Sequence, residues 1–93
     1  MIRSFKRKAA AAIFEGKLLK GFPPDLFKTA RRKLEAINAA TSLEDLRVPP
    51  GNRLEALSGA RAGQHSIRIN DQWRVCFVWT AEGAENVEIV DYH

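Results

Sequence analysis

The sequence predicts an α+β fold in which two helices pack on one face of an antiparallel β-meander. Helical periodicity dominates the first 40 residues, and β-like runs separated by turn residues fill the chain from residue 53 onward. The composition, 45% hydrophobic and 28% charged, is that of an ordinary globular protein. A chain of 93 residues has room for one core, so we expect a single domain over residues 1–93.

The first half of the chain is predicted to hold a short strand and two helices. Residues 2–5 alternate apolar and polar side chains, which indicates a strand. The alanine-rich residues 6–15 predict a helix, and Gly16 is placed to end it. Pro24 suits the first turn of a second helix that continues to about Ala40. The residues of this helix that should face the core are Leu26, Ala30, Leu34 and Ile37.

The second half is predicted to form the sheet. Residues 41–44, Thr-Ser-Leu-Glu, fit a capping box that opens a short helical turn, and a loop follows over residues 48–52. The β-like runs are then residues 53–57, 65–69, 73–80 and 86–92. Their short connections predict antiparallel neighbours.

The turn 70–72, Asn-Asp-Gln, sets the register of the central hairpin. If all three residues form the loop, Ile67 faces Val75 on one side of the sheet and Arg68 faces Arg74 on the other. A two-residue loop would mix the two faces. The preferred register also pairs Ile69 with Trp73, His65 with Phe77 and Ser66 with Cys76.

Two arginines directly opposite one another destabilise a sheet unless acids or a bound anion compensate. One interpretation of Arg68 and Arg74 is structural, with Glu55 or the acids of the final strand as partners. The other is a phosphate clamp, because a guanidinium binds phosphate oxygens bidentately and stays charged as negative charge builds up in a transition state. The spacing leaves both open.

Positive charge is concentrated in the N-terminal half. The formal net charge is +4 and the sequence pI is about 9.6, which favours polyanionic partners. The basic residues either form a solvated surface or contact nucleic acid. The candidates for RNA contact in this half are Lys6, Arg7, Lys8, Lys28, Arg31 and Arg32.

Several classes of protein are not expected. Cys76 is the single cysteine, so no internal disulfide forms, and no set of thiols and histidines has metal-ligand spacing. We therefore expect no metal, no cofactor and a cytoplasmic protein. The apolar stretch of residues 9–14 is too short for a signal peptide, and no segment is long enough to span a membrane.

The chain ends in Asp91, Tyr92 and His93. Strict strand alternation puts Asp91 and His93 on one face and Tyr92 on the other. All three share one site only if the end of the strand twists or bulges. A terminal histidine is otherwise simply exposed.

Four long stretches carry a resemblance that covers essentially the whole chain: residues 1–6 (MIRSFK), 49–59 (PPGNRLEALSG), 62–74 (AGQHSIRINDQWR) and 87–93 (VEIVDYH). They resemble the HigB branch, including GraT-like toxins, of the RelE superfamily of bacterial toxin-antitoxin systems. The resemblance implies a RelE-like fold and an mRNA endonuclease that works in the ribosomal A site and arrests growth. It also implies a HigA-like helix-turn-helix antitoxin, contact with the 70S ribosome and mRNA, and contact with operator DNA only through the antitoxin complex.

The resemblance further implies a catalytic set. Arg74 matches the strand arginine of HigB-like toxins, and Asp91, Tyr92 and His93 match their terminal Asp-Tyr-His. Some relatives have a histidine where this chain has Glu55. The general base and general acid are therefore Glu55 and His93 in either order.

The set of candidates extends to the central hairpin. An arginine of those relatives falls at Asn70, and Arg68, two residues earlier on the same face, is expected to substitute for it. Asn70 and Arg53 join the candidates for RNA contact. No metal is needed, because the RNA 2′-hydroxyl can attack the adjacent phosphorus.

Two alternatives stand beside this reaction. The chain could be a catalytically weak interaction module of the same fold that modulates the DNA binding of its antitoxin, although Arg74 and the complete terminus argue against it. It could also be a ribosome-independent ribonuclease or a protein that binds ribosomal RNA. Growth assays and cleavage of naked RNA distinguish the three.

Overall fold

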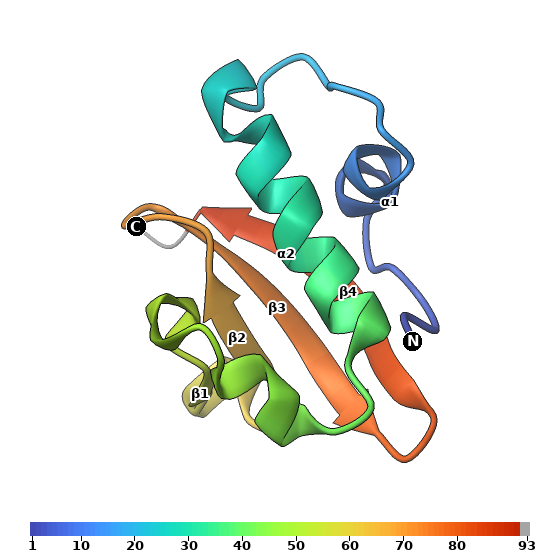
Figure 1. Ribbon diagram of the computed structural model, residues 1–93, viewed down its shortest axis with the longest axis vertical. Coiled ribbons are helices and arrows are strands. Elements are labelled where there is room, and N and C mark those ends of the chain that lie inside the picture. Colours follow the sequence, from blue (N-terminus) through green and yellow to red (C-terminus); the bar gives the residue numbers. More distant parts are fainter. Residues whose placement is uncertain (92–93) are drawn as a thin grey trace.

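The computed structural model describes residues 1–91 and has an α+β architecture (Figure 1). Two α-helices precede a four-stranded antiparallel sheet whose strand order is β1-β2-β3-β4. The elements are α1 (Lys8–Phe14), α2 (Phe27–Ala39), β1 (Glu55–Ala56), β2 (His65–Arg68), β3 (Trp73–Thr80) and β4 (Gly83–Asp91). The predicted α+β class and the antiparallel meander are confirmed.

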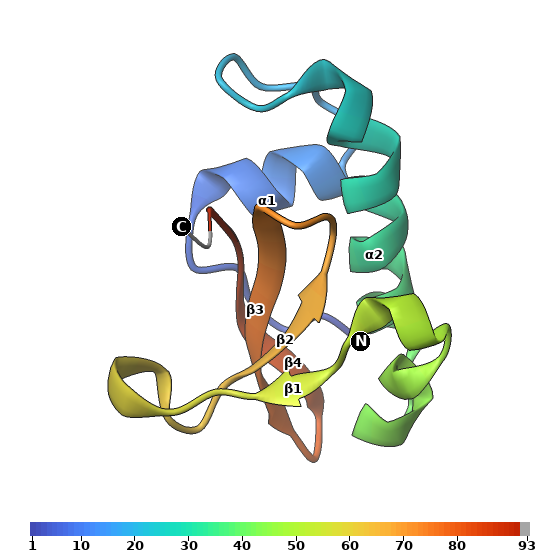
Figure 2. The ribbon, with the colours of Figure 1, turned by 90° about the vertical axis from the view of Figure 1, so that its left-hand side faces the viewer.

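The helices lie on one side of the sheet. Helix α2 crosses the sheet diagonally, and α1 lies beside α2 on the β4 side (Figures 1 and 2). Three of the four predicted core residues of the second helix, Ala30, Leu34 and Ile37, are fully buried. Leu26 is only half-buried because Pro24–Leu26 forms a separate 3₁₀ turn before α2. Against α2 the sheet packs side chains that are fully buried: Ile67, Val75, Phe77 and Val87.

The predicted register of the central hairpin is confirmed. Ile67 pairs with Val75 and Arg68 pairs with Arg74. The backbone N–H of Ile69 donates to the carbonyl of Trp73 at 2.9 Å, which closes the turn over residues 70–72. Because side chains alternate along a strand, this register gives the sheet one apolar face toward α2 and one polar face.

The N-terminal residues pair with β4 through isolated bridges rather than as a named strand. Ile2 bridges Ala84 and Phe5 bridges Val87, both in parallel orientation. β4 begins at Gly83, three residues before the predicted start. Gly83 has φ +131°, and a Cβ there would collide with the Met1 carbonyl, so the close approach of the N-terminus requires glycine.

The capping box is one residue later than predicted. Ser42 is the N-cap of the 3₁₀ turn Leu43–Arg47, and Asp45, not Glu44, completes the box. The Thr41 N–H donates to Asp45 at 2.9 Å and the Ser42 N–H at 3.3 Å. These two bonds, that of Thr41 first, hold the pKa of Asp45 below its ordinary value.

Among residues 1–91, no α-helix combines the length and the apolar character that crossing a bilayer requires.

Candidate functional site

Arg74 is a largely buried charged side chain of the sheet. It projects from β3 on the polar face, and its side chain is only 12% exposed. Its Nε donates to the Ser66 hydroxyl at 2.8 Å, and its Nη2 donates to the Arg53 carbonyl at 2.8 Å. Two bonds from different nitrogens fix the plane of the guanidinium as well as its position.

Glu55 lies beside this guanidinium. Its Oε1 is 3.9 Å from Arg74 Nη2, and its side chain is half exposed. Glu55 belongs to β1 and pairs with Ser66 of β2, the residue that binds Arg74. The structure therefore brings together two of the predicted site residues, a fixed cation and a solvent-accessible carboxylate.

The opposed arginines have different partners. Arg74 faces Glu55, which was one of the expected acids, whereas Arg68 Nη2 lies 2.5 Å from Asp71 Oδ1 in the hairpin turn. Asp71, whose side chain is 96% exposed, was not expected in this role. An ion pair so exposed contributes little to stability, so its partners are able to exchange for other ions.

Asp91 lies at the same end of the sheet. It pairs with Trp73 at the start of β3, and its Oδ2 accepts a hydrogen bond from Gln72 Nε2 at 2.9 Å. The end of β4 thus lies next to the β2–β3 turn (Figure 1). Tyr92 and His93, the other two residues of the predicted terminus, lie outside the described residues.

Two further candidate residues, Asn70 and Arg53, have structural roles at this site. Asn70 Oδ1 accepts the backbone N–H of Gln72 at 2.9 Å and of Trp73 at 2.8 Å, so Asn70 shapes the hairpin turn. Arg53 has a left-handed backbone, with φ 47° and ψ 55°, and its carbonyl is the acceptor for Arg74.

The basic residues near the N-terminus divide into two groups. Arg7 and Lys8 are exposed at the start of α1. Lys6 instead pairs with Glu88 at 3.4 Å, and Glu88 also pairs with Arg61 at 3.6 Å. Because Glu88 is only 3% exposed, these two cations compensate a nearly buried carboxylate.

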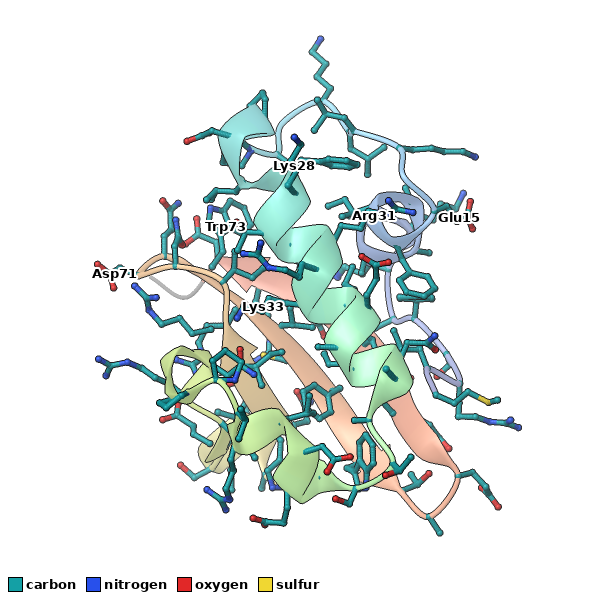
Figure 3. The ribbon with its side chains drawn as sticks, viewed as in Figure 1. Glu15, Lys28, Arg31, Lys33, Asp71 and Trp73 are labelled. Atoms are coloured by element: carbon teal, nitrogen blue, oxygen red, sulfur yellow. The ribbon has the colours of Figure 1, made fainter. Side chains whose placement is uncertain are left out.

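The basic residues of α2 point in different directions (Figure 3). Lys28 is exposed near the beginning of the helix, and Arg31 extends toward α1, where its Nε donates to the Phe14 carbonyl at 3.3 Å. Arg32 is exposed. Lys33 faces the β2–β3 side, and its Nζ lies 2.5 Å from Asn52 Oδ1.

Lys33 belongs to a cationic cluster that sequence reasoning missed. Burial, followed by the charges of Arg32 and Arg68, lowers the pKa of Lys33. The positive field of α2 therefore reaches the arginine of the hairpin. The helical period places Lys33 between the polar and apolar faces, and that position alone does not indicate its partner.

Ser66 was also not recognised as a site residue. The predicted register, with Ser66 opposite Cys76 on the face of Arg74, was the signal that could have identified it. Cys76, on the same face, is fully buried, and burial raises the pKa of its thiol. It is therefore a poor nucleophile at neutral pH.

The chemistry of this face rests on guanidinium and carboxylate groups. Within residues 1–91, no three histidine, cysteine or acidic side chains are grouped so that they could hold a metal ion. The arrangement can bind an anion at a fixed guanidinium and offers a carboxylate beside it for proton transfer.

Comparison with known proteins identifies a family that matches almost the whole chain. Residues 3–93 match the family described as the RelE-like toxin of the type II toxin-antitoxin system HigB. Toxin HigB-1 of Vibrio cholerae is 41% identical over 80 residues, which are 85% of this chain and 84% of that protein. Endoribonuclease HigB of Proteus vulgaris is 33% identical over 97 aligned positions that span both chains in full. An uncharacterized protein of Haemophilus influenzae is 40% identical over 63 residues, 68% of this chain and 60% of that protein.

Proposed function

We propose that the chain, which belongs to the HigB-like family of RelE-like toxins from type II toxin-antitoxin systems, is an endoribonuclease that cleaves mRNA in the ribosomal A site. The observation that carries the proposal is the Arg74 guanidinium, held by Ser66 and by the Arg53 carbonyl beside the accessible carboxylate of Glu55. The relative from Proteus vulgaris is named an endoribonuclease, which supports the same activity here.

The proposed reaction uses the RNA's own nucleophile. A general base removes the proton of the 2′-hydroxyl, whose oxygen bonds to the adjacent phosphorus while the bond from phosphorus to the 5′-oxygen breaks. A general acid gives its proton to that 5′-oxygen. The products are a 2′,3′-cyclic phosphate and a 5′-hydroxyl. Glu55 and His93 fill the two proton-transfer roles, in either order.

In this proposal the arginines stabilise the negative charge of the phosphorane. Arg74 is already oriented and needs no rearrangement when negative charge develops, which is the property that makes such a group effective. Arg68 would exchange its exposed partner Asp71 for a phosphate oxygen. In this proposal Asp91 orients His93 or braces Arg74, and Tyr92 stacks on a base or bonds the phosphate.

The basic surface would hold the ribosome. Lys28, Arg31 and Arg32 of α2, with Arg7 and Lys8 at the start of α1, are exposed and would contact RNA phosphates. Membership in a type II family implies an antitoxin partner. We propose that this antitoxin is a HigA-like helix-turn-helix protein and that operator DNA is contacted only through their complex.

The test combines growth and cleavage. Induced expression of the wild-type chain should arrest growth, and primer extension on a reporter mRNA should show new 5′ ends within translated codons. His93→Gln and Arg74→Ala should abolish both effects while circular dichroism shows a folded protein. If both variants arrest growth as strongly as the wild type, the site is assigned incorrectly. If the wild type leaves growth and mRNA unchanged, a non-catalytic interaction module is the better description.

A further inference from the structure

Asn52 is a buried amide in a segment that belongs to no strand or α-helix. It is fully buried. Its Nδ2 donates to the carbonyls of Leu46 at 3.1 Å and Val48 at 3.3 Å, and its Oδ1 accepts from Lys33 Nζ at 2.5 Å. A buried amide destabilises a fold unless its hydrogen bonds are made. Asn52 thus favours the one arrangement of this segment in which all three hydrogen bonds are present.

The next residue, Arg53, links the conformation of this segment to the position of Arg74. Arg53 has a left-handed backbone, which is uncommon and energetically unfavourable for a residue other than glycine. Here the Asn52 N–H donates to the Pro49 carbonyl at 2.9 Å, and the Arg53 N–H donates to the Pro50 carbonyl at 3.1 Å. In this conformation the Arg53 carbonyl points at Arg74 Nη2, 2.8 Å away.

We propose that Asn52 is a positioning residue for Arg74 and acts through the Arg53 carbonyl. The inference rests on the proposed function, in which Arg74 stabilises the phosphorane. Ser66, on a strand, fixes Nε, whereas the loop fixes Nη2. Loss of the hydrogen bond at Nη2 removes one of the bonds that set the orientation of the guanidinium plane. A displacement of about 1 Å at such a group reduces catalysis by up to roughly a hundredfold.

Lys33 connects Asn52 to the basic helix α2. Its ammonium group is the α2 partner of Asn52, and its charge lies near Arg32 and Arg68. Figure 3 shows Lys33 on the side of α2 that faces the β2–β3 hairpin. Helix α2 therefore has two roles in the proposal: its exposed cations contact RNA, and Lys33 holds the loop that orients Arg74.

The direct test is a double-mutant cycle between Asn52 and Arg74 in the cleavage of mRNA on programmed ribosomes. Asn52→Ala should lower kcat on the order of tenfold and change KM less than about twofold. Arg74→Lys lacks Nη2, so in that background the same substitution should change kcat less than about twofold. Thermal denaturation of each variant sets an assay temperature at which it is folded.

A second pair of variants keeps the test decisive if Asn52→Ala does not fold. Lys33→Met and Arg32→Met each remove one positive charge from the same turn of α2, but only the first removes a hydrogen bond to Asn52. Both should raise KM, and only Lys33→Met should also lower kcat. Equal effects of these two variants on kcat would overturn the inference.

The other possible outcomes of the double-mutant cycle would overturn the inference. An equal loss of kcat on Asn52→Ala in both Arg74 backgrounds would show that Asn52 acts on the fold alone, and an unchanged kcat would show that it does not act on the reaction. If Arg74→Lys and Arg74→Ala both cleave as the wild type does, the proposed role of Arg74 fails, and the inference fails with it for that separate reason.

Discussion

Replacing Ser66 by alanine removes one oxygen atom from the support of Arg74. Ser66 is fully buried, and its hydroxyl accepts from Arg74 Nε at 2.8 Å. A hydrogen bond to a charged group contributes about 1.5–3 kcal/mol, and the guanidinium is too buried for water to replace the hydroxyl fully. We expect the free energy of unfolding to fall by about 2 kcal/mol, which lowers Tm by roughly 8–16 °C in a domain of this size. Cleavage should slow on the order of tenfold because Nε is no longer fixed.

Urea denaturation followed by circular dichroism measures the stability, and ribosome-bound mRNA cleavage at a temperature where both proteins are folded measures the rate. Ser58→Ala is the matched control. Ser58 is exposed and makes no side-chain capping bond, so its replacement should change stability by less than about 0.5 kcal/mol. A Ser66→Ala variant as stable and as active as the Ser58→Ala control would refute the idea that Ser66 orients Arg74.

Three more predictions concern the surrounding fold. Gly83→Ala should destabilise the protein by about 1–3 kcal/mol or more, measured by urea denaturation, because the new Cβ meets the Met1 carbonyl at a φ of 131°; wild-type stability would contradict the close approach of the N-terminus. Asp45→Ala should destabilise at pH 7, and the difference should vanish in acid. The folded-state pKa of Asp45 lies below its ordinary 3.8, so its contribution is complete above pH 3.8 and is lost as the pH falls below that value through the lowered pKa. A difference that stays constant down to about pH 2 would count against the capping box. Glu88→Gln should lower the free energy of unfolding, measured by thermal melting, by about 1–2 kcal/mol. This loss is smaller than for a fully buried ion pair because the two cationic partners of Glu88 remain partly in water. A loss above about 4 kcal/mol would mean that those partners are less hydrated than their exposure indicates.

The sheet could be predicted largely from the sequence because its register depends on local rules. The turn at residues 70–72 and the alternation of side chains were sufficient to place Arg68 opposite Arg74. The N-terminal residues were different. Their pairing with β4 joins segments more than 80 residues apart, and residues 2–5 alone contain no information about that partner.

The side-chain partners at the site were predicted only in part. Glu55 was among the expected partners of the arginines because its strand could be placed. Asp71 and the Arg53 carbonyl were not among the expected partners. The contact of Asp71 with Arg68 depends on the side-chain rotamer of Asp71, and the direction of the Arg53 carbonyl depends on the left-handed φ of that residue. Neither property follows from hydrophobic periodicity. The hydrogen bond between Lys33 and Asn52 is likewise set by the docking of α2 on the loop.

The central claim is that the Arg74 site cleaves mRNA on the ribosome. The most direct measurement incubates purified wild-type and Arg74→Ala proteins with one 5′-labelled mRNA, either naked or bound to ribosomes with an empty A site. We expect the wild type to cleave only the ribosome-bound mRNA, at the A-site codon, and to leave a 2′,3′-cyclic phosphate, whereas Arg74→Ala leaves it intact. Cleavage of naked mRNA at an equal rate, or cleavage by Arg74→Ala at the wild-type rate, would contradict the claim.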